Sequence, residues 1–278
     1  MGYCVKILAD SISPVECRLT TFELTYPRFI HSELMTHRAF SRNAASSRAI
    51  PIEKMIQRVT EDPAEPVHWG KNQKGMQANE ELDDWSRETA RATWFHARDA
   101  AVDHAQTLVR LGVHKQIVNR LLEPWMWITV IVSATDYGNY FNLRCHKDAQ
   151  PEFRRLAEMM WDAYSNSEPR LVQTGDWHLP LIFLEDTDIA LADRIKLSVA
   201  RCARVSYLTH DGRRDPEADL ALHDRLAASG HWSPFEHAAE ASPFPNYIGN
   251  FRGWLQYRKG FPTENRPTFI NAAEAVAS

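Results

Sequence analysis

The chain has 278 residues, of which 44% are hydrophobic and 24% are charged, and its formal net charge is −4. This length allows one large domain or two small ones, and the apolar fraction is sufficient for a real core. The acidic balance provides no global basic field, which speaks against a nucleic-acid binder and requires any phosphate site to be local.

Targeting and redox signals favour a cytoplasmic protein. No apolar run approaches the length of a membrane span, because the stretch at 125–132 is too short. The first residues lack the charged and apolar regions of a signal peptide. The four cysteines, at positions 4, 17, 145 and 202, show no paired spacing, which argues against a disulfide framework and against structural zinc.

Two strands and a helical turn are predicted before the first long loop. Apolar and β-branched residues alternate weakly in the first strand and clearly in the second. The expected elements are strands over 3–9 and 18–26, a helical turn over 29–35, a loop over 41–48 and a helix from Pro51 to about Val59.

Residues 62–77 contain prolines and glycines among polar residues and predict a long loop of the kind that forms lids or interface arms. The run 125–132 is compatible with a buried strand or a buried helix, since periodicity does not separate them. The other expected elements are helices over 80–111 (closed by Gly112), 114–122, 150–165, 190–205 and 219–229 (capped by Gly230), a connector with a short strand over 171–186 and a polar turn over 210–216.

Three arginines lie close together in the segment 35–48, namely Arg38, Arg42 and Arg48, among His37, Asn43 and several hydroxyl residues. Guanidinium groups form bidentate hydrogen bonds with phosphate oxygens, and small hydroxyl residues let the backbone approach a ligand. The segment therefore predicts a site for a phosphorylated ligand, with a solvated arginine-bearing loop as the alternative.

Two further blocks carry polar residues in apolar surroundings. Arg144 follows the apolar and aromatic residues of 139–143, where an unpaired cation is costly to bury, so either a carboxylate or a ligand is expected beside it. The segment 230–237 contains His231, Glu236 and His237, but the two histidines are six positions apart around a proline. This spacing matches no zinc pattern, and we expect no metal site.

These blocks resemble motifs of the flavin-dependent thymidylate synthases (ThyX). Thr36-His37-Arg38, followed after seven residues by Ser46, is similar to the Arg-His-Arg-x7-Ser signature, with Thr36 in place of its first arginine. Segment 139–150 is similar to Asn-Phe-Phe-Asn-Leu-Arg…His-Ala-Gln. Segments 203–207 and 230–237 resemble Ala-Arg-Val-Ser-(Phe/Tyr) and Gly-His-x-(Ser/Thr)-Pro-Phe-Glu-His. The departures are Thr36, Asp148 for His, Ser133 for Asn and Thr135 for Arg.

The resemblance implies an α+β fold, a mixed or antiparallel sheet packed with long helices, and makes the run 125–132 a helix. It covers one domain, 1–278, in permuted order: the third block is N-terminal in the family, but here 196–266 follows 18–165. Residues 251–258 resemble a degenerate copy of the family segment Arg-Gln-Trp-x-Arg-His-Arg, which contains the Arg-His-Arg signature. A circular permutation with one duplicated segment accounts for this order.

The resemblance also implies an activity. Family members convert dUMP to dTMP with FAD, methylenetetrahydrofolate and NADPH, and they are homotetramers whose sites combine several subunits. A pyrimidine deoxynucleoside monophosphate is thus the expected ligand. The matching cofactor residues are Thr36, His37, Arg38, Asn43, Asn139, His231, Ser233 and Glu236. The nucleotide residues are Ser46, Ser47, Arg48, Arg120 and Arg144, of which Ser46, Arg48 and Arg144 are the expected catalytic residues.

Three alternatives remain open at the level of sequence. The departures from the motifs are compatible with C5 hydroxymethylation of dUMP or dCMP at the same site. Cys145 beside Arg144 could supply a thiolate nucleophile, or could be an inert buried thiol. A binding module for nucleotides or single strands, without catalysis, would use the same arginines with the tryptophans.

Overall fold

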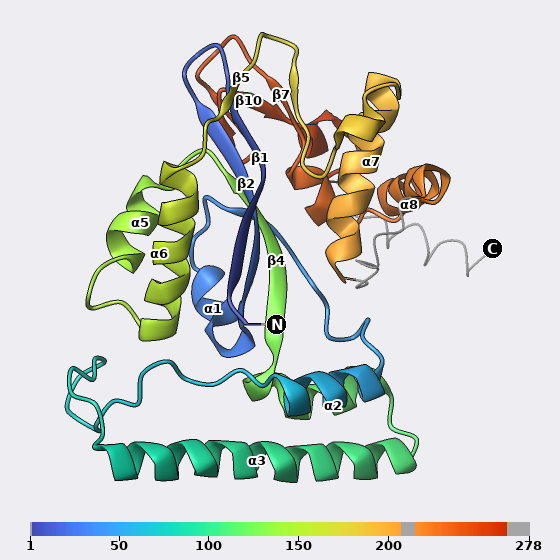
Figure 1. Ribbon diagram of the computed structural model, residues 1–278. Coiled ribbons are helices and arrows are strands. Elements are labelled where there is room, and N and C mark those ends of the chain that lie inside the picture. The colour runs from blue at the N-terminus through green and yellow to red at the C-terminus, as the bar shows by residue number, and fades with distance from the viewer. Residues whose placement is uncertain (1, 207–214, 266–278) are drawn as a thin grey trace.

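The computed structural model describes residues 2–206 and 215–265, and a five-stranded sheet forms its centre (Figure 1). The strand order is β3-β4-β2-β1-β5, and all neighbours are antiparallel except β1 and β5. The strands are β1 (Cys4–Ile12), β2 (Arg18–Pro27), β3 (Ser41–Ala44), β4 (Trp127–Ala134) and β5 (Arg170–Leu171).

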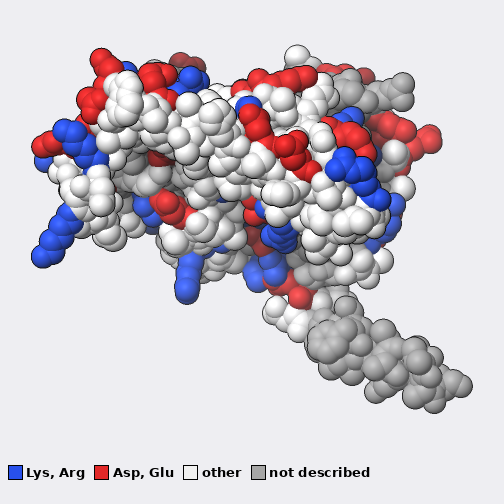
Figure 2. All heavy atoms as spheres, turned by 90° about the horizontal axis from the view of Figure 1, so that it is seen from below, with Lys and Arg blue, Asp and Glu red and all other residues white. Residues whose placement is uncertain are grey.

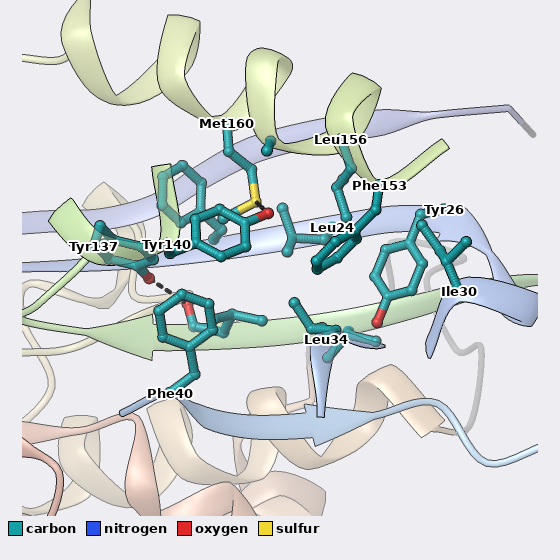
Figure 3. Close-up of a cluster of buried hydrophobic side chains, with 14 of the residues drawn as sticks. Leu24, Tyr26, Ile30, Leu34, Phe40, Tyr137, Tyr140, Phe153, Leu156 and Met160 are labelled. Carbon is teal, nitrogen blue, oxygen red and sulfur yellow. Dashed lines mark hydrogen bonds between the residues drawn. The ribbon is translucent and has the colours of Figure 1, made fainter. Parts of the chain in front are cut away.

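One face of this sheet carries the main apolar core. Strand residues with period two, such as Leu24 and Val130, point toward α5 (Gly138–Arg144) and α6 (Pro151–Ser165). The rings of Phe40, Tyr137, Tyr140 and Phe153 gather between the sheet and α6 (Figure 3). The Tyr140 hydroxyl donates to the Met160 sulfur at 3.2 Å, so this buried polar atom has a partner.

A second layer crosses one end of the sheet and consists of α2 (Ile52–Glu61), α3 (Asp84–Arg110), α4 (Lys115–Val118) and a 3-10 helix (Asn119–Trp125). Met55, Val118 and Leu122 lie in its buried core, whereas Ala105 is the one buried residue of α3. The helix α3 therefore contributes only a narrow stripe to the core. The short helix α1 (His31–Leu34) connects β2 with β3.

The C-terminal third packs against the opposite face of the sheet. Cys202 and Val205 contact Ile131 of β4 there. This part contains α7 (Leu191–Ala203), α8 (Pro216–Ala228), a three-stranded sheet of β6 (Trp177–His178), β7 (Ala239–Ala241) and β10 (Trp254–Gln256), and a hairpin of β8 (Tyr247–Ile248) and β9 (Phe251–Arg252).

The α+β prediction is confirmed, and most expected elements are present. The helix expected over 125–132 is wrong: this run is β4, whose β-branched residues pair with β2 on one side and β3 on the other. The loop expected over 41–48 begins with strand β3, because its backbone completes the edge of β4. The long helix begins at Asp84 rather than residue 80, since Asp83 caps it by accepting from the Ser86 amide at 2.9 Å.

The helix α5 and the short strands β7 to β10 were not predicted from the sequence. Tyr207 of the third block and most of the polar turn expected over 210–216 lie outside the described residues. Within the described ranges, no helix combines the length and apolar character needed to cross a membrane.

Candidate active site

The first two motif blocks meet at Arg144, which lies at the C-terminal end of α5. Its Nε donates to Nε2 of His37 at 3.0 Å across 107 positions of sequence, and its Nη2 donates to the Thr36 hydroxyl at 3.5 Å. The guanidinium also lies 4.6 Å above the centre of the Phe153 ring. The carboxylate of Glu33 is 3.9 Å away. The partner of Arg144 is thus chiefly a histidine, with a carboxylate at longer range.

His37 is a neutral acceptor in this arrangement. Burial lowers its pKa to about 4, and the positive charges of Arg144 and Arg42 contribute in the same direction. The ring stacks on Phe40 and meets Tyr140 edge-on, so its orientation is set by the aromatic core. Arg42 donates to the backbone carbonyls of Met35 and His37 at 2.9 and 3.2 Å, which supports the turn that carries the histidine.

A pocket of about 410 Å³ opens beside this junction. Its walls include Thr36, His37, Arg38 and Asn139. Arg38 and Asn139 are exposed, and the side chains of both are free of hydrogen bonds and ion pairs to the part of the chain that the structure describes. Four residues of the expected cofactor set therefore come together at one cavity, and one of them presents an unneutralised guanidinium.

Other members of the expected cofactor set lie on the opposite side of β3. The amide of Asn43 donates to the Cys202 carbonyl at 2.8 Å, and its oxygen accepts from the Ser233 hydroxyl at 3.1 Å. Glu236 is paired with Arg258, the last residue of the segment 251–258. These side chains join the third block to β3, but their polar groups are engaged within the chain.

A row of buried polar groups continues across the same face of the sheet. The hydroxyls of Thr21 and Ser133 are 2.6 Å apart, and each also contacts a buried histidine: His178 at 2.8 Å and His237 at 2.8 Å. Burial lowers the pKa of both histidines to about 3, so both are neutral. Sequence reasoning missed Thr21 and His178, since strands far apart in the chain bring them together and no local pattern marks them.

The remaining expected nucleotide residues lie elsewhere. Arg48 is exposed, and Ser47 is held by Asn119, which donates to the Ser47 carbonyl at 2.7 Å. Arg120 is exposed and pairs with Glu123 at 3.3 Å. The chain after β3 runs toward α2 on the side of the molecule away from α5 (Figure 1). Ser46, Ser47, Arg48 and Arg120 thus form a second group, separate from Arg144.

His231 is exposed and lines neither this pocket nor the polar row. The thiol of Cys145 is half-buried, and burial raises its pKa, with the charge of Glu158 acting in the same direction. Of the two sequence-based alternatives, the raised pKa favours the inert thiol over the thiolate nucleophile. Across residues 2–206 and 215–265, no three His, Cys, Asp or Glu residues are arranged to hold a metal ion.

Comparison with models of protein families identifies the family to which the chain belongs. The family described as thymidylate synthase complementing protein, Thy1, matches residues 4–170, which is more than half of the sequence. The chain belongs to the Thy1 family. The ThyX resemblance is thereby confirmed, and this Thy1 protein is an enzyme of the thymidylate synthase type. The match includes the first two motif blocks and ends before the third.

Among solved structures, the chain is similar in part to a UMP/dUMP methylase, PolB, from Streptomyces cacaoi. Its complexes with 5-Br dUMP and 5-Br UMP superpose with TM-scores of 0.46 and 0.47, at 16% and 17% identity. The alignments cover 59% of this chain and 90% or 88% of that protein. No curated protein matches the chain at a significant level.

Proposed function

We propose that this Thy1 protein converts dUMP to dTMP in an FAD-dependent reaction, with methylenetetrahydrofolate and NADPH as co-substrates. One observation carries the proposal: residues of two motif blocks, Arg144 and the pair Thr36–His37, are bonded to each other at the edge of a pocket that also contains Arg38. This is the juxtaposition that a shared site for a phosphorylated cofactor and an anionic substrate requires.

The residues present fit the phosphate-bearing end of FAD. Arg38 is exposed at the 410 Å³ pocket without a carboxylate partner among the described residues, and Asn139 and Thr36 add polar groups on the same walls. An arginine with no internal partner is stabilised when a phosphate binds it. We infer that Arg38, Asn139 and Thr36 hold the cofactor phosphates, with His37 behind them. When bound, reduced FAD supplies the hydride for the reaction.

Arg144 is the residue best placed to act on the substrate. Two of its nitrogens are bonded to His37 and Thr36, which orients the guanidinium, and the neutral histidine leaves its positive charge intact. A fixed cation beside a pyrimidine carbonyl stabilises the negative charge that develops when C5 becomes nucleophilic. The aromatic ring of Phe153 beneath it excludes water from one side.

A second candidate is C5 hydroxymethylation of dUMP or dCMP, in which water captures the exocyclic methylene group. The observation that favours it concerns Ser233 and Glu236, which the ThyX resemblance assigns to the flavin. Here Ser233 is bonded to Asn43 and Glu236 to Arg258. The contacts of these two residues with the flavin ring, which would guide hydride transfer, would then differ from those in the family.

A non-catalytic binding module for single strands receives less support. Charges of both signs are scattered over the face seen in Figure 2. On α3, Arg91 and Arg98 are paired with Glu65 and Asp99 at 2.6 Å in each case. Paired arginines do not form the basic groove that tracks a nucleic-acid backbone.

Absorbance spectroscopy followed by turnover tests the proposal. The purified protein, supplied with FAD, is expected to retain a visible flavin band through gel filtration and to bleach with NADPH. Product analysis with methylenetetrahydrofolate then decides the rest: dTMP from dUMP supports methylation, and a 5-hydroxymethyl nucleotide supports the second candidate. Failure to bind FAD at any concentration would contradict the flavin-dependent reaction.

The position of Arg48 and Arg120, separate from Arg144, agrees with the homotetramer that the resemblance implies, in which one subunit's arginines serve another's site. We propose that assembly for this protein. Light scattering in solution is expected to give four times the mass of one chain, and a monomer with full activity would exclude a shared site.

A further inference from the structure

A second and larger pocket has Arg144 in its wall. Its volume is about 640 Å³, and residues 66–79 and 144–152 form most of its walls. Pockets of a few hundred cubic ångströms suit small organic ligands. The pocket is distinct from the 410 Å³ pocket, but Arg144 connects the two, because it lines the larger one and bonds to His37 and Thr36 of the smaller one.

Residues 66–82, here termed the arm, form an ordered hairpin-like structure. Gly70 and Glu81 make an antiparallel bridge, and the Leu82 amide donates to the Trp69 carbonyl at 2.9 Å. His68 contacts Glu81 at 3.1 Å and the Ala78 carbonyl at 2.9 Å. These contacts fix a long loop over the pocket, whereas a loop of this length without them would be costly to order.

The arm is anchored to the segment that follows Arg144. The backbone amide of Val67 donates to the Glu152 carboxylate at 2.7 Å, and the side-chain amide of Gln77 donates to the Asp148 backbone carbonyl at 3.4 Å. Glu152 is only 3% exposed, and its second oxygen accepts from Gln150. Because both oxygens are engaged, this buried carboxylate has its hydrogen bonds satisfied within the protein.

The walls of the pocket combine the groups that a pyrimidine nucleotide needs. Arg144 and Lys147 are cations, and the Lys147 ammonium has no partner among the described residues. Phe29 and Trp94, whose ring centres are 6.2 Å apart, supply an aromatic surface. The amides of Gln77 and Asn79 come from the arm, and an amide offers both a donor and an acceptor to the edge of a base.

We propose that the arm closes the nucleotide site of this enzyme. Lys147 binds the phosphate, and Arg144 lies beside a carbonyl group of the base. The base lies against Phe29 and Trp94, and Gln77 and Asn79 determine which pyrimidine is accepted. This inference rests on the proposed function, because it assumes that the ligand is a pyrimidine deoxynucleoside monophosphate. An amide that bonds to the base edge discriminates between uracil and cytosine, whose donors and acceptors are exchanged at position 4.

Calorimetric titration with dUMP and dCMP tests the role of the arm. Gln77→Ala is expected to weaken dUMP binding by roughly tenfold, since a hydrogen bond to the base and the anchoring contact to the Asp148 carbonyl are both lost. The preference for dUMP over dCMP is expected to fall as well, because only the bond to the base distinguishes the two. Gly70→Ala is expected to weaken binding at least as much, because a Cβ at position 70 lies 2.2 Å from the Cβ of Ala78 and forces the arm to shift. Lys74→Ala, an exposed arm residue outside the pocket, is the control and is expected to bind as the wild type does.

A second measurement uses the unaltered protein, so that it does not depend on the folding of a variant. Trypsin cleavage after Lys71 and Lys74 of the arm is expected to slow when dUMP is added. Unchanged cleavage, together with wild-type dUMP affinity in Gln77→Ala and Gly70→Ala, would overturn the role of the arm and leave the proposed function in place. If the wild-type protein binds neither nucleotide, the proposed function fails and the inference fails with it.

Discussion

At the scale of single residues, Arg144 and His37 form the arrangement on which the proposed chemistry depends. The histidine accepts a hydrogen bond because burial keeps it neutral, and the positive charge of the arginine is only weakly offset, since its nearest carboxylate, Glu33, is 3.9 Å away. Neither property is visible in the sequence, where the two residues belong to different motifs. The contact explains how a cation is held in a fixed position in a partly apolar site.

Replacing Arg144 by Lys tests the geometry rather than the charge. The ammonium cannot reproduce the forked contacts to His37 and Thr36, so we expect kcat/KM for dUMP to fall by roughly 100-fold, the loss typical of removing an oriented charge-stabilising group. Steady-state kinetics measures this. Arg110→Lys, at an exposed residue of α3, is the matched control, and equal activity in the two variants would contradict the role of Arg144.

Cys145 is expected to be dispensable. Its raised pKa leaves the thiol protonated near neutral pH, and a protonated thiol is a poor nucleophile. The variant Cys145→Ser should therefore keep its turnover within about twofold, because the hydroxyl is similar in size. Complete loss of turnover in a folded variant would revive the thiolate mechanism.

At the scale of elements, the packing of α6 on the sheet holds the site together. Phe153 is fully buried, and its ring lies under Arg144 and next to His37. The same residue thus belongs to the core and to the floor of the site. A substitution that disturbs the packing of this helix should therefore displace Arg144 and His37, even though no polar group is changed.

Removing the Phe153 ring leaves a cavity between α6 and the sheet. We expect Phe153→Ala to lower the free energy of unfolding by roughly 3–5 kcal/mol, as for other buried aromatic truncations. Urea denaturation followed by circular dichroism measures the change. Glu158→Ala, on the exposed side of the same helix, should cost less than about 1 kcal/mol, since its pair with Arg154 is exposed. Similar losses in both variants would contradict this assignment of the core.

At the scale of the whole molecule, a buried polar row joins the central sheet to the C-terminal third. His178 and His237 are fully buried, and Nε2 of His237 has no hydrogen-bond partner within the described structure. A proton added at that nitrogen would place an uncompensated charge in the interior. Burial therefore makes the interface between these two parts sensitive to acid.

The pH dependence of stability follows from these two histidines. Their pKa values are about 3 in the folded protein, below the ordinary 6.5, so the unfolded chain binds protons first as the pH falls. The free energy of unfolding should be constant with respect to these groups above about pH 6.5 and should decrease as the pH drops toward 3. Denaturation at several pH values measures the slope, which His237→Gln should reduce. An unchanged slope in that variant would show that His237 is not responsible.

The sequence by itself determined most of the helices and the three motif blocks, because these depend on local periodicity and on residue types at fixed spacing. The α+β class followed from the resemblance of those blocks to ThyX motifs. It also brought Thr36, His37, Arg38, Asn139 and Arg144 into one expected site. Only the tertiary structure decided that 125–132 is a strand, since both its neighbours, β2 and β3, pair with it from other parts of the chain. The same holds for the separation of Arg48 and Arg120 from Arg144, for the engagement of Ser233 and Glu236, and for the arm that faces Arg144. In each case the partners are far apart in sequence, and no local pattern records which distant side chain a residue meets.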